Sequence, residues 1–364
     1  MYSSYSFLQQ SQLAAQGYYD TQSTYLLVYA PGRNTALRAT LADQLHRKFR
    51  LADTLGSALT EGVDGVLLVS EDVECMSTAL MCFAKALQDG ADYAVCNAVF
   101  GFGGATALYQ SRAHLAQNRC ALVSRPLLER CRAAAKDPEN VTELLALAAQ
   151  FCAHPTRIPQ ALLHYERDIC AEDAFSATGK RAFLMSHVLD MTGAPIVLVS
   201  AVPVLRSMGY EVVVLGPSDG GALQLFVDAG AAVITRPGIR ATPNLWGLAL
   251  CTDLVLVNTV VMARTVRALS GTAVPVLWWL HDAFAGYPHI AHQIPTKLAE
   301  NVRLYSVGHH AANAMHAVRP DFQIGQLIYG LPDYAAEDFP RCDLGYPADK
   351  PLFATVGSFE RRKG

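Results

Sequence analysis

The sequence has few charged residues and no run of basic ones. Of its 364 residues 17% are charged, and the formal net charge is -3 at pH 7. Proteins that bind nucleic acid through phosphate contacts cluster lysine and arginine, so this composition does not predict a nucleic-acid partner. Hydrophobic residues make up 51%, which favours a packed core over extensive disorder. At roughly 150 residues per domain, the length corresponds to about two to two and a half domains.

No hydrophobic run is long enough to cross a membrane. The most apolar stretches, 194–205 and 273–280, fall short of the roughly 18 uninterrupted residues that indicate a spanning helix, and prolines interrupt both. The N-terminus, MYSSYSFLQQSQ, lacks the basic segment followed by an apolar one that marks a secretory signal. The sequence therefore predicts a soluble, cytoplasmic protein.

The nine cysteines lack the spacing of a disulfide framework or a zinc site. Their number is odd, they are scattered along the chain, and none forms a C-x-x-C pair. We therefore expect buried free thiols in a reducing compartment. His309, His310 and His316 do not predict a metal site either, because adjacent side chains point to different faces and no carboxylate has a suitable spacing.

Apolar runs and helical periodicity organise the first half of the chain. Short apolar runs bounded by turn residues predict strands, and apolar residues at helical spacing predict helices. Residues 1–24 form a polar leader, and the small and polar residues 168–181 form a linker. The predicted strands are 25–30, 65–70, 93–100, 120–124 and 156–165, and the predicted helices are 35–49, 52–61, 78–88, 126–135 and 141–153.

From residue 182 onward strands and helices alternate regularly. This alternation implies right-handed crossovers and a doubly wound parallel sheet. We therefore expect an α/β protein with two separate domains, 25–167 and 182–345, and no sheet that continues from one to the other. Residues 346–364 hold a last strand and a basic turn, and we expect them to begin a further domain. The predicted strands are 182–186, 211–216, 232–235, 253–258, 274–280, 303–307 and 352–356, and the predicted helices are 196–208, 221–229, 260–269 and 295–301.

A glycine turn joins the first strand of the second half to its helix. The turn is Thr192-Gly193-Ala194-Pro195. Proline suits the first turn of a helix, and the free amides at a helix N-terminus can bind phosphate. An ordinary connection between strand and helix would have the same composition, so both interpretations stay open.

His281 and Asp282 come directly after the predicted strand 274–280. In an open α/β sheet, residues just beyond the carboxyl ends of the strands face the ligand crevice. An imidazole in that place can act on a hydroxyl group or hydrogen-bond a sugar. It can equally serve as a packing or capping residue.

Two charged segments also follow predicted strands. The three carboxylates of Ser70–Glu74 can hold Mg²⁺ or Mn²⁺, or can lie in a solvated turn before a helix, whose N-terminus favours acids. The basic residues of 361–364 can bind a diphosphate beside a glycine turn, or can be a solvated charge run.

Five segments of the second half together resemble family-4 glycosyltransferases of the GT-B type. The resemblance implies a Rossmann-like N-terminal domain, a cleft shared with a C-terminal domain, and transfer of a sugar with retention. It implies a UDP- or GDP-linked nucleotide-sugar as donor, with no cofactor and no required metal. In the family's order, the segments are MTGAPIVLVSAVPVLRSMGYEVVVLGPSDGG, DLVLVNT, VPVLWWLHDAFAGY, LIYGLPD and FATVGSFERRKG.

The resemblance also assigns site residues. His281 matches the catalytic histidine of the cleft. Gly193 and Ala194 match the glycine loop that faces the donor diphosphate, and Arg362 and Lys363 match the basic turn that binds it.

This chain departs from the family at two places. Ser358 stands where the family has an arginine, so Arg361 or Arg362 would have to replace it. The E-x7-E motif of the C-terminal domain does not occur in the 364 residues. We therefore expect the donor site to be incomplete and residues 1–364 to transfer no sugar by themselves.

Residues 25–167 resemble, less closely, family-2 glycosyltransferases of the GT-A type. Residues 31–34 (PGRN) are similar to the P-x-Y-N turn, 67–72 (LLVSED) to the strand that carries D-x-D, and 159–165 (PQALLHY) to a trailing segment. Ser70 replaces the first aspartate of D-x-D, and the strand that should precede this motif is missing. The resemblance therefore implies a degenerate GT-A-like domain, and we expect no catalytic metal at Ser70–Glu74.

Three function classes remain. The first is a retaining glycosyltransferase that acts on a glycan or lipid-linked acceptor in surface polysaccharide synthesis, with peripheral membrane contact left open. The second is a non-catalytic module that binds a glycan or a partner. The third is a nucleotide-dependent epimerase or dehydrogenase, which the lack of G-x-G-x-x-G after strand 182–186 argues against. The sequence does not indicate the oligomeric state.

Overall fold

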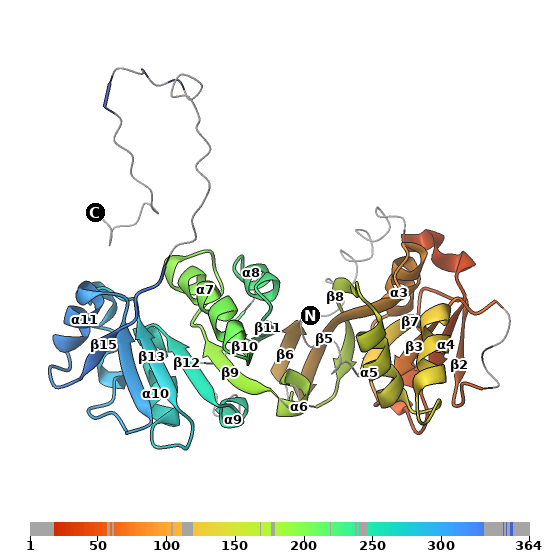
Figure 1. Ribbon diagram of the computed structural model, residues 1–364, viewed down its shortest axis with the longest axis horizontal. Helices are drawn as coiled ribbons and strands as arrows, with labels where there is room; N and C mark the ends of the chain where they lie inside the picture. The colour runs from red at the N-terminus through yellow and green to blue at the C-terminus, as the bar shows by residue number, and fades with distance from the viewer. Residues whose placement is uncertain are drawn as a thin grey trace.

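Two α/β units lie side by side in the computed structural model (Figure 1). We call residues 18–167 the N-terminal unit and residues 180–330 the C-terminal unit. The structure describes residues 18–56, 59, 62–102, 105–110, 119–167, 169–175, 179–218, 220–236, 239, 246–330, 345, 347, 350 and 351. The predicted strand 352–356, Arg362 and Lys363 lie outside the described residues.

The N-terminal unit is built on a mixed sheet in the order β2-β1-β3-β7-β5. β1 is parallel to β2 and β3, and β7 is antiparallel to β3 and β5. β8 runs parallel to β5 and also pairs with the short β4. The strands are β1 (Leu26–Tyr29), β2 (Phe49–Ala52), β3 (Gly65–Val69), β4 (Glu74–Cys75), β5 (Tyr93–Phe102), β6 (Ala105–Gln110), β7 (Cys120–Ser124) and β8 (Thr156–Tyr165).

Helices cover both faces of this sheet. α2 and α3 pack on one face, where Leu37 and Phe83 share a buried cluster with Leu67. α4 and α5 pack on the other face, where Leu128 and Leu144 join a second buried cluster. The helices are η1 (Tyr18–Ser23), α2 (Thr35–Leu41), α3 (Ala79–Gln88), α4 (Arg125–Ala134) and α5 (Val141–Phe151).

The C-terminal unit contains seven parallel strands in the order β15-β14-β13-β12-β9-β10-β11. This order confirms the predicted Rossmann-like, doubly wound sheet. α7 and α8 pack on one face, and α10 and α11 on the other. The strands are β9 (Lys180–Met185), β10 (Tyr210–Gly216), β11 (Ala232–Thr235), β12 (Leu254–Asn258), β13 (Val276–Leu280), β14 (Val302–Ser306) and β15 (Ile324–Gln326), and the helices are α6 (Ala171–Ala174, in the linker), α7 (Gly193–Ser207), α8 (Leu223–Asp228), α9 (Trp246–Ala249), η4 (Val260–Met262), α10 (Ala263–Leu269), η5 (Phe284–Gly286), η6 (Ala291–Gln293) and α11 (His309–His316).

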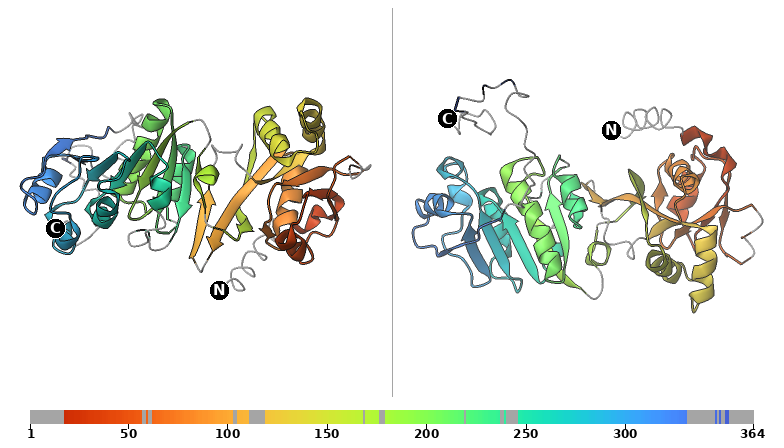
Figure 2. Two further views of the ribbon diagram at one scale, coloured as in Figure 1. Left: turned by 90° about the horizontal axis from the view of Figure 1, so that it is seen from below. Right: turned by 45° about the horizontal axis from the view of Figure 1, so that its top comes forward.

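Among the described strands, one pair joins the two units into one sheet. β6 forms a hairpin with β5 and pairs antiparallel with β11 through three residue pairs, of which Ile234 and Tyr109 form the middle one. Figure 2 shows this hairpin reaching from the N-terminal unit to the C-terminal unit. The expectation that no sheet crosses the linker is therefore wrong. The physical reason is that β11 would otherwise be an edge strand with a row of unpaired backbone groups. The domain limits themselves stay a prediction.

The first helix of the chain ends earlier than its periodicity indicates. α2 ends at Leu41, and residues 49–52 form β2 instead of continuing a helix. The expectation that no strand precedes the D-x-D-like segment is therefore wrong: β2 is that strand, and Asp53 follows it directly. The sequence hides this strand because β2 lies at the edge of the sheet and none of its residues is fully buried, so its letters, FRLA, form no apolar run.

The predicted helix 295–301 is also absent, and these described residues form bends and turns. The guanidinium of Arg319 donates to the backbone oxygens of Ala291, Ile294 and Pro295 at 3.3, 2.7 and 2.9 Å. These hydrogen bonds hold residues 291–295 in a non-helical path against the segment that follows α11. The sequence analysis did not predict β4, β6, β15, α9 or α11.

Other expectations concern cysteines and membranes. The eight cysteines within the described ranges are all free, as expected, although Cys170 and Cys251 are exposed and not buried. Among the described helices, none has both the length and the apolar character that membrane spanning requires.

Candidate functional site

The best candidate for a site lies at the carboxyl ends of β9, β12 and β13. The strand order of the C-terminal unit reverses between β9 and β12, and ligands of open α/β sheets bind at such a switch point. His187 follows β9, Thr259 follows β12, and His281 follows β13. Because the three strands are neighbours, these residues gather at one edge of the sheet. We call this edge the switch-point crevice, after the position where ligands bind in open α/β sheets.

His281 has a polar atom without a partner. Its Nε2 is buried and makes no hydrogen bond within the described part of the chain. The ring packs at a tilt against Trp279, with 4.8 Å between the ring centroids. Burial, and secondarily the nearby His187, lower the pKa of His281 to about 4. The imidazole is therefore neutral at physiological pH, and it can donate a hydrogen bond to a hydroxyl group or accept one from it.

Thr259 has an unusual backbone for a β-branched residue. Its φ of 70° makes it the single non-glycine residue with positive φ in the described ranges. Such a conformation costs about 1–3 kcal/mol and persists only where the surroundings impose it. Its N–H donates to the carbonyl of Trp279, and its carbonyl accepts from Trp278 Nε1, both at 2.8 Å. Its Oγ1 lies 3.3 Å from Nδ1 of His187.

Asp282 supports this turn. Its carboxylate accepts a hydrogen bond from the backbone N–H of Val260 at 2.6 Å. Asp282 therefore holds the backbone directly after the strained Thr259.

Gly193 and Ala194 form the start of α7, as the glycine turn predicted, although the helix begins at Gly193 and not at 196. Thr192 at the N-cap makes no capping hydrogen bond with its side chain, and a Cβ at Gly193 would meet nothing within 4 Å. Asn258 Nδ2 donates to the carbonyl of Ala194 at 3.0 Å, which ties this helix start to the end of β12. The glycine turn thus lies beside the switch-point crevice.

Three further polar atoms near the crevice are buried without a partner in the described ranges: Asn258 Oδ1, Ser306 Oγ and Tyr287 Oη. Burial, and then the charge of Asp282, raise the pKa of Tyr287. Sequence reasoning missed His187, Thr259 and Tyr287, because each is an isolated polar residue in a loop. The available signal was position, since His187 and Thr259 each follow a buried parallel strand.

The acidic segment of the N-terminal unit behaves differently. Asp72 accepts hydrogen bonds from the backbone N–H groups of Thr35, Ala36 and Leu37 at 3.0–3.1 Å, and from the Thr35 hydroxyl at 3.0 Å. Burial raises the pKa of Asp72, but these hydrogen bonds outweigh burial and lower the pKa overall. Asp72 is therefore the N-terminal cap of α2, supplied from another part of the chain.

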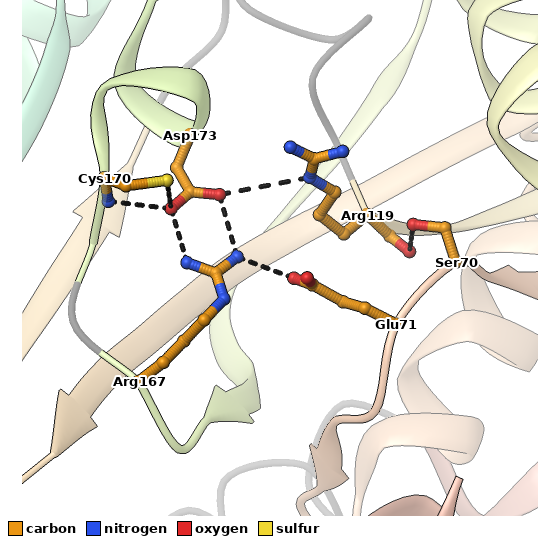
Figure 3. Close-up of polar contacts among 6 residues, drawn as sticks. All are labelled: Ser70, Glu71, Arg119, Arg167, Cys170 and Asp173. Atoms are coloured by element: carbon orange, nitrogen blue, oxygen red, sulfur yellow. Dashed lines mark hydrogen bonds and ion pairs between the residues drawn. The ribbon is translucent and has the colours of Figure 1, made fainter. Parts of the chain in front are cut away.

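Glu71 belongs to an ionic cluster with Arg167 and Asp173 (Figure 3). Arg167 donates to both oxygens of Asp173 at 2.6 and 2.9 Å and to Glu71 at 2.7 Å. The Asp173 side chain is only 3% exposed, and Nε of Arg119 lies 3.9 Å from it. Asp173 also accepts from the backbone N–H of Cys170 at 2.9 Å. The cluster fastens the beginning of the linker to the end of β3.

Glu74, the third acid, lies 2.6 Å from Nδ1 of His164 on the neighbouring β8. In the ranges that the structure describes, no group of three or more His, Cys, Asp or Glu side chains could hold a metal ion. Each carboxylate after β3 thus has a partner within the protein. These contacts support the expectation that Ser70–Glu74 holds no catalytic metal, and the expectation stays a prediction.

His316 is one of the three histidines that the sequence does not predict to bind a metal. Its Nε2 lies 3.0 Å from the carbonyl oxygen of Phe322.

Part of the chain matches a known family model. Residues 178–316 match the family model described as "Glycosyl-transferase family 4". The match covers β9 to α11 and includes His187, Gly193, Thr259 and His281. The C-terminal unit is therefore similar to this family over most of its length, and the match does not extend to the N-terminal unit, so the GT-A resemblance stays a prediction.

Two other comparisons add little. The crystal structure of the glycosyltransferase GlyE from Streptococcus pneumoniae TIGR4 matches at 9% identity over 73% of this chain and 88% of that chain, with a TM-score of 0.21. A TM-score this low does not establish a shared fold. The comparison with curated proteins found no match.

Proposed function

We propose that the C-terminal unit is a GT-B-type glycosyltransferase domain that transfers a sugar with retention. The donor is a UDP- or GDP-linked sugar, the acceptor is a glycan or a lipid-linked glycan, and the process is the synthesis of surface polysaccharide. The observation that carries this proposal is the neutral imidazole of His281, whose buried Nε2 lacks a partner in the described part of the chain. This imidazole stands at the end of a parallel strand inside the region that matches a glycosyltransferase family.

The proposed roles follow from the chemistry of the crevice. The backbone amides of Gly193 and Ala194 bind the donor diphosphate, because a helix N-terminus carries a partial positive charge. His281 hydrogen-bonds a hydroxyl of the donor sugar and holds the reacting carbon in place. Arg362 and Lys363 add positive charge against the diphosphate. This arrangement uses no metal or cofactor, and the free cysteines favour a cytoplasmic location.

A second candidate function applies to the N-terminal unit. Because Glu71, Asp72 and Glu74 are all engaged within the protein, we propose that this unit transfers no sugar. It recognises a glycan or docks a partner, as a non-catalytic module.

The test is a binding and hydrolysis screen with UDP-glucose, UDP-N-acetylglucosamine and GDP-mannose, by calorimetry and by release of free nucleotide. His281→Ala is compared with His164→Gln, a change at a half-buried histidine of the N-terminal unit. We expect at least one donor to bind, with about 10-fold or more lower affinity in His281→Ala and no change in His164→Gln. Binding of none of these donors, or an equal loss in both variants, would overturn the proposal.

A further inference from the structure

Thr259 is held from several directions. Its own N–H and carbonyl are bonded to Trp279 and Trp278, and the next amide, that of Val260, is bonded to Asp282. Trp278 and Trp279 belong to β13, and Asp282 is the residue after His281. The backbone at Thr259 is thus held by β13 and by Asp282, which lie on either side of His281 in the sequence.

The side chain at this position makes a contact that glycine cannot make. A positive φ alone favours glycine, which adopts it without strain. Threonine instead presents Oγ1 to Nδ1 of His187 at 3.3 Å. The retained hydroxyl, and not the backbone shape, is therefore the feature that requires an explanation.

The contact links the two histidines of the crevice. β12 lies between β9 and β13 in the sheet, so Thr259 stands between His187 and His281. His187 lies near enough to His281 to contribute to the lowered pKa of His281. Fixing the His187 ring therefore also shapes the surroundings of His281.

We propose that Thr259 is a positioning residue that orients His187, and that His187 contacts the sugar of the donor beside His281. The identity of the ligand rests on the proposed function. Two imidazoles can each donate or accept one hydrogen bond, depending on the tautomer, and sugar hydroxyls can do both. The pair therefore fits a neutral, hydroxyl-rich sugar ring.

The first experiment tests the positioning without any ligand. Ring-nitrogen NMR signals of His187 are recorded in the full 364-residue chain for wild type, Thr259→Val and Thr259→Ser. Valine keeps the branch and removes the hydroxyl, and serine keeps the hydroxyl. We expect the His187 signals to shift in Thr259→Val and to return to the wild-type values in Thr259→Ser. Unchanged signals in Thr259→Val, or equal shifts in both variants, would overturn the inference.

A second variant covers the case in which valine does not fold. Thr259→Gly accepts the positive φ without strain and also lacks the hydroxyl. We expect it to fold, as judged by circular dichroism, and to shift the His187 signals as described for valine. Wild-type signals in folded Thr259→Gly would contradict the positioning role.

The third experiment tests the ligand contact, with UDP-glucose and GDP-mannose compared with free UDP and GDP by calorimetry. We expect His187→Ala to weaken nucleotide-sugar binding about 10-fold and to leave free-nucleotide binding unchanged. An equal loss for both kinds of probe, or no loss, would overturn the contact. If wild type binds none of these probes, the proposed function fails and the sugar contact with it, while the NMR comparison still decides whether Thr259 orients His187.

Discussion

The two units use the carboxyl ends of their parallel strands in opposite ways. After β3 in the N-terminal unit, Glu71, Asp72 and Glu74 all have partners within the protein. After β9 and β12 in the C-terminal unit, His187 and Thr259 contact each other, while Nε2 of His281 after β13 is buried without a partner in the described ranges. An unsatisfied buried polar group costs about 1–3 kcal/mol. A fold that retains one at a switch point therefore points to a ligand there, whereas saturated carboxylates point to a structural role.

The largest expected effect is at His281. Where transfer is measurable, we expect His281→Ala to lower turnover by roughly 10²-fold, the usual scale for a positioned catalytic side chain. The fold should survive, because the residue lies beyond the end of β13. An unchanged transfer rate in His281→Ala would contradict the proposed role of His281. It would also remove the functional difference between the two units.

The pH profile gives a further check on His281. Burial and His187 lower its pKa to about 4, so the ring stays neutral as the pH is raised or lowered between 5 and 8. We expect donor binding to be free of a titration step from His281 in that range. A step near pH 6.5 that disappears in His281→Ala would contradict the neutral imidazole.

The next effect is at Arg167 in the N-terminal unit. Removing one partner of a buried ion pair commonly costs about 3–5 kcal/mol. Because the Arg167 side chain is 35% exposed, and Arg119 remains near Asp173, we expect Arg167→Ala to lower the free energy of unfolding by about 2 kcal/mol. Urea denaturation at pH 7 measures this, with Lys85→Ala at an exposed helical pair as the control. Equal losses in the two variants would show that the cluster does not stabilise the fold.

Asp72 should give a smaller, pH-dependent effect. Asparagine keeps one acceptor oxygen but lacks the negative charge, which is worth about 0.3–1 kcal/mol near a helix N-terminus, so we expect Asp72→Asn to be less stable than wild type by that amount at pH 7. The pKa of Asp72 is lowered in the folded state, so its contribution is complete above the unfolded pKa of about 3.9. The contribution is lost as the pH falls through the folded pKa. A difference between the two proteins that persists below both pKa values would contradict this role.

The smallest expected signal is from metal titration. We expect calorimetry with Mn²⁺ to show no tight, stoichiometric binding that Asp72→Ala abolishes, because the Asp72 oxygens already accept four hydrogen bonds. Such binding would make the acidic segment a metal site and remove its difference from the switch-point crevice.

Much of the fold follows from local pattern. β1, β3 and β7 are fully buried strands, and their continuous apolar runs identify them. The sequence did not indicate β2, because an edge strand needs no apolar run. It also did not indicate that Arg319, outside the predicted helix 295–301, bonds the carbonyls of Ile294 and Pro295 where that helix was expected to begin. His281 could be proposed from its place after a strand, whereas its proximity to His187 could not.

By itself, the sequence determined the buried strands, the alternation that makes the C-terminal sheet doubly wound, and the position of His281 at a strand end, since these depend on residues close together in the chain. Only the tertiary structure decided that β6 joins the two units, that Arg167 neutralises Glu71 and Asp173, and that Thr259 takes a strained backbone beside His187. Glu71 and Arg167 stand 96 positions apart, and His187 and Thr259 stand 72 apart. Their contacts arise from strand order, which local periodicity does not encode.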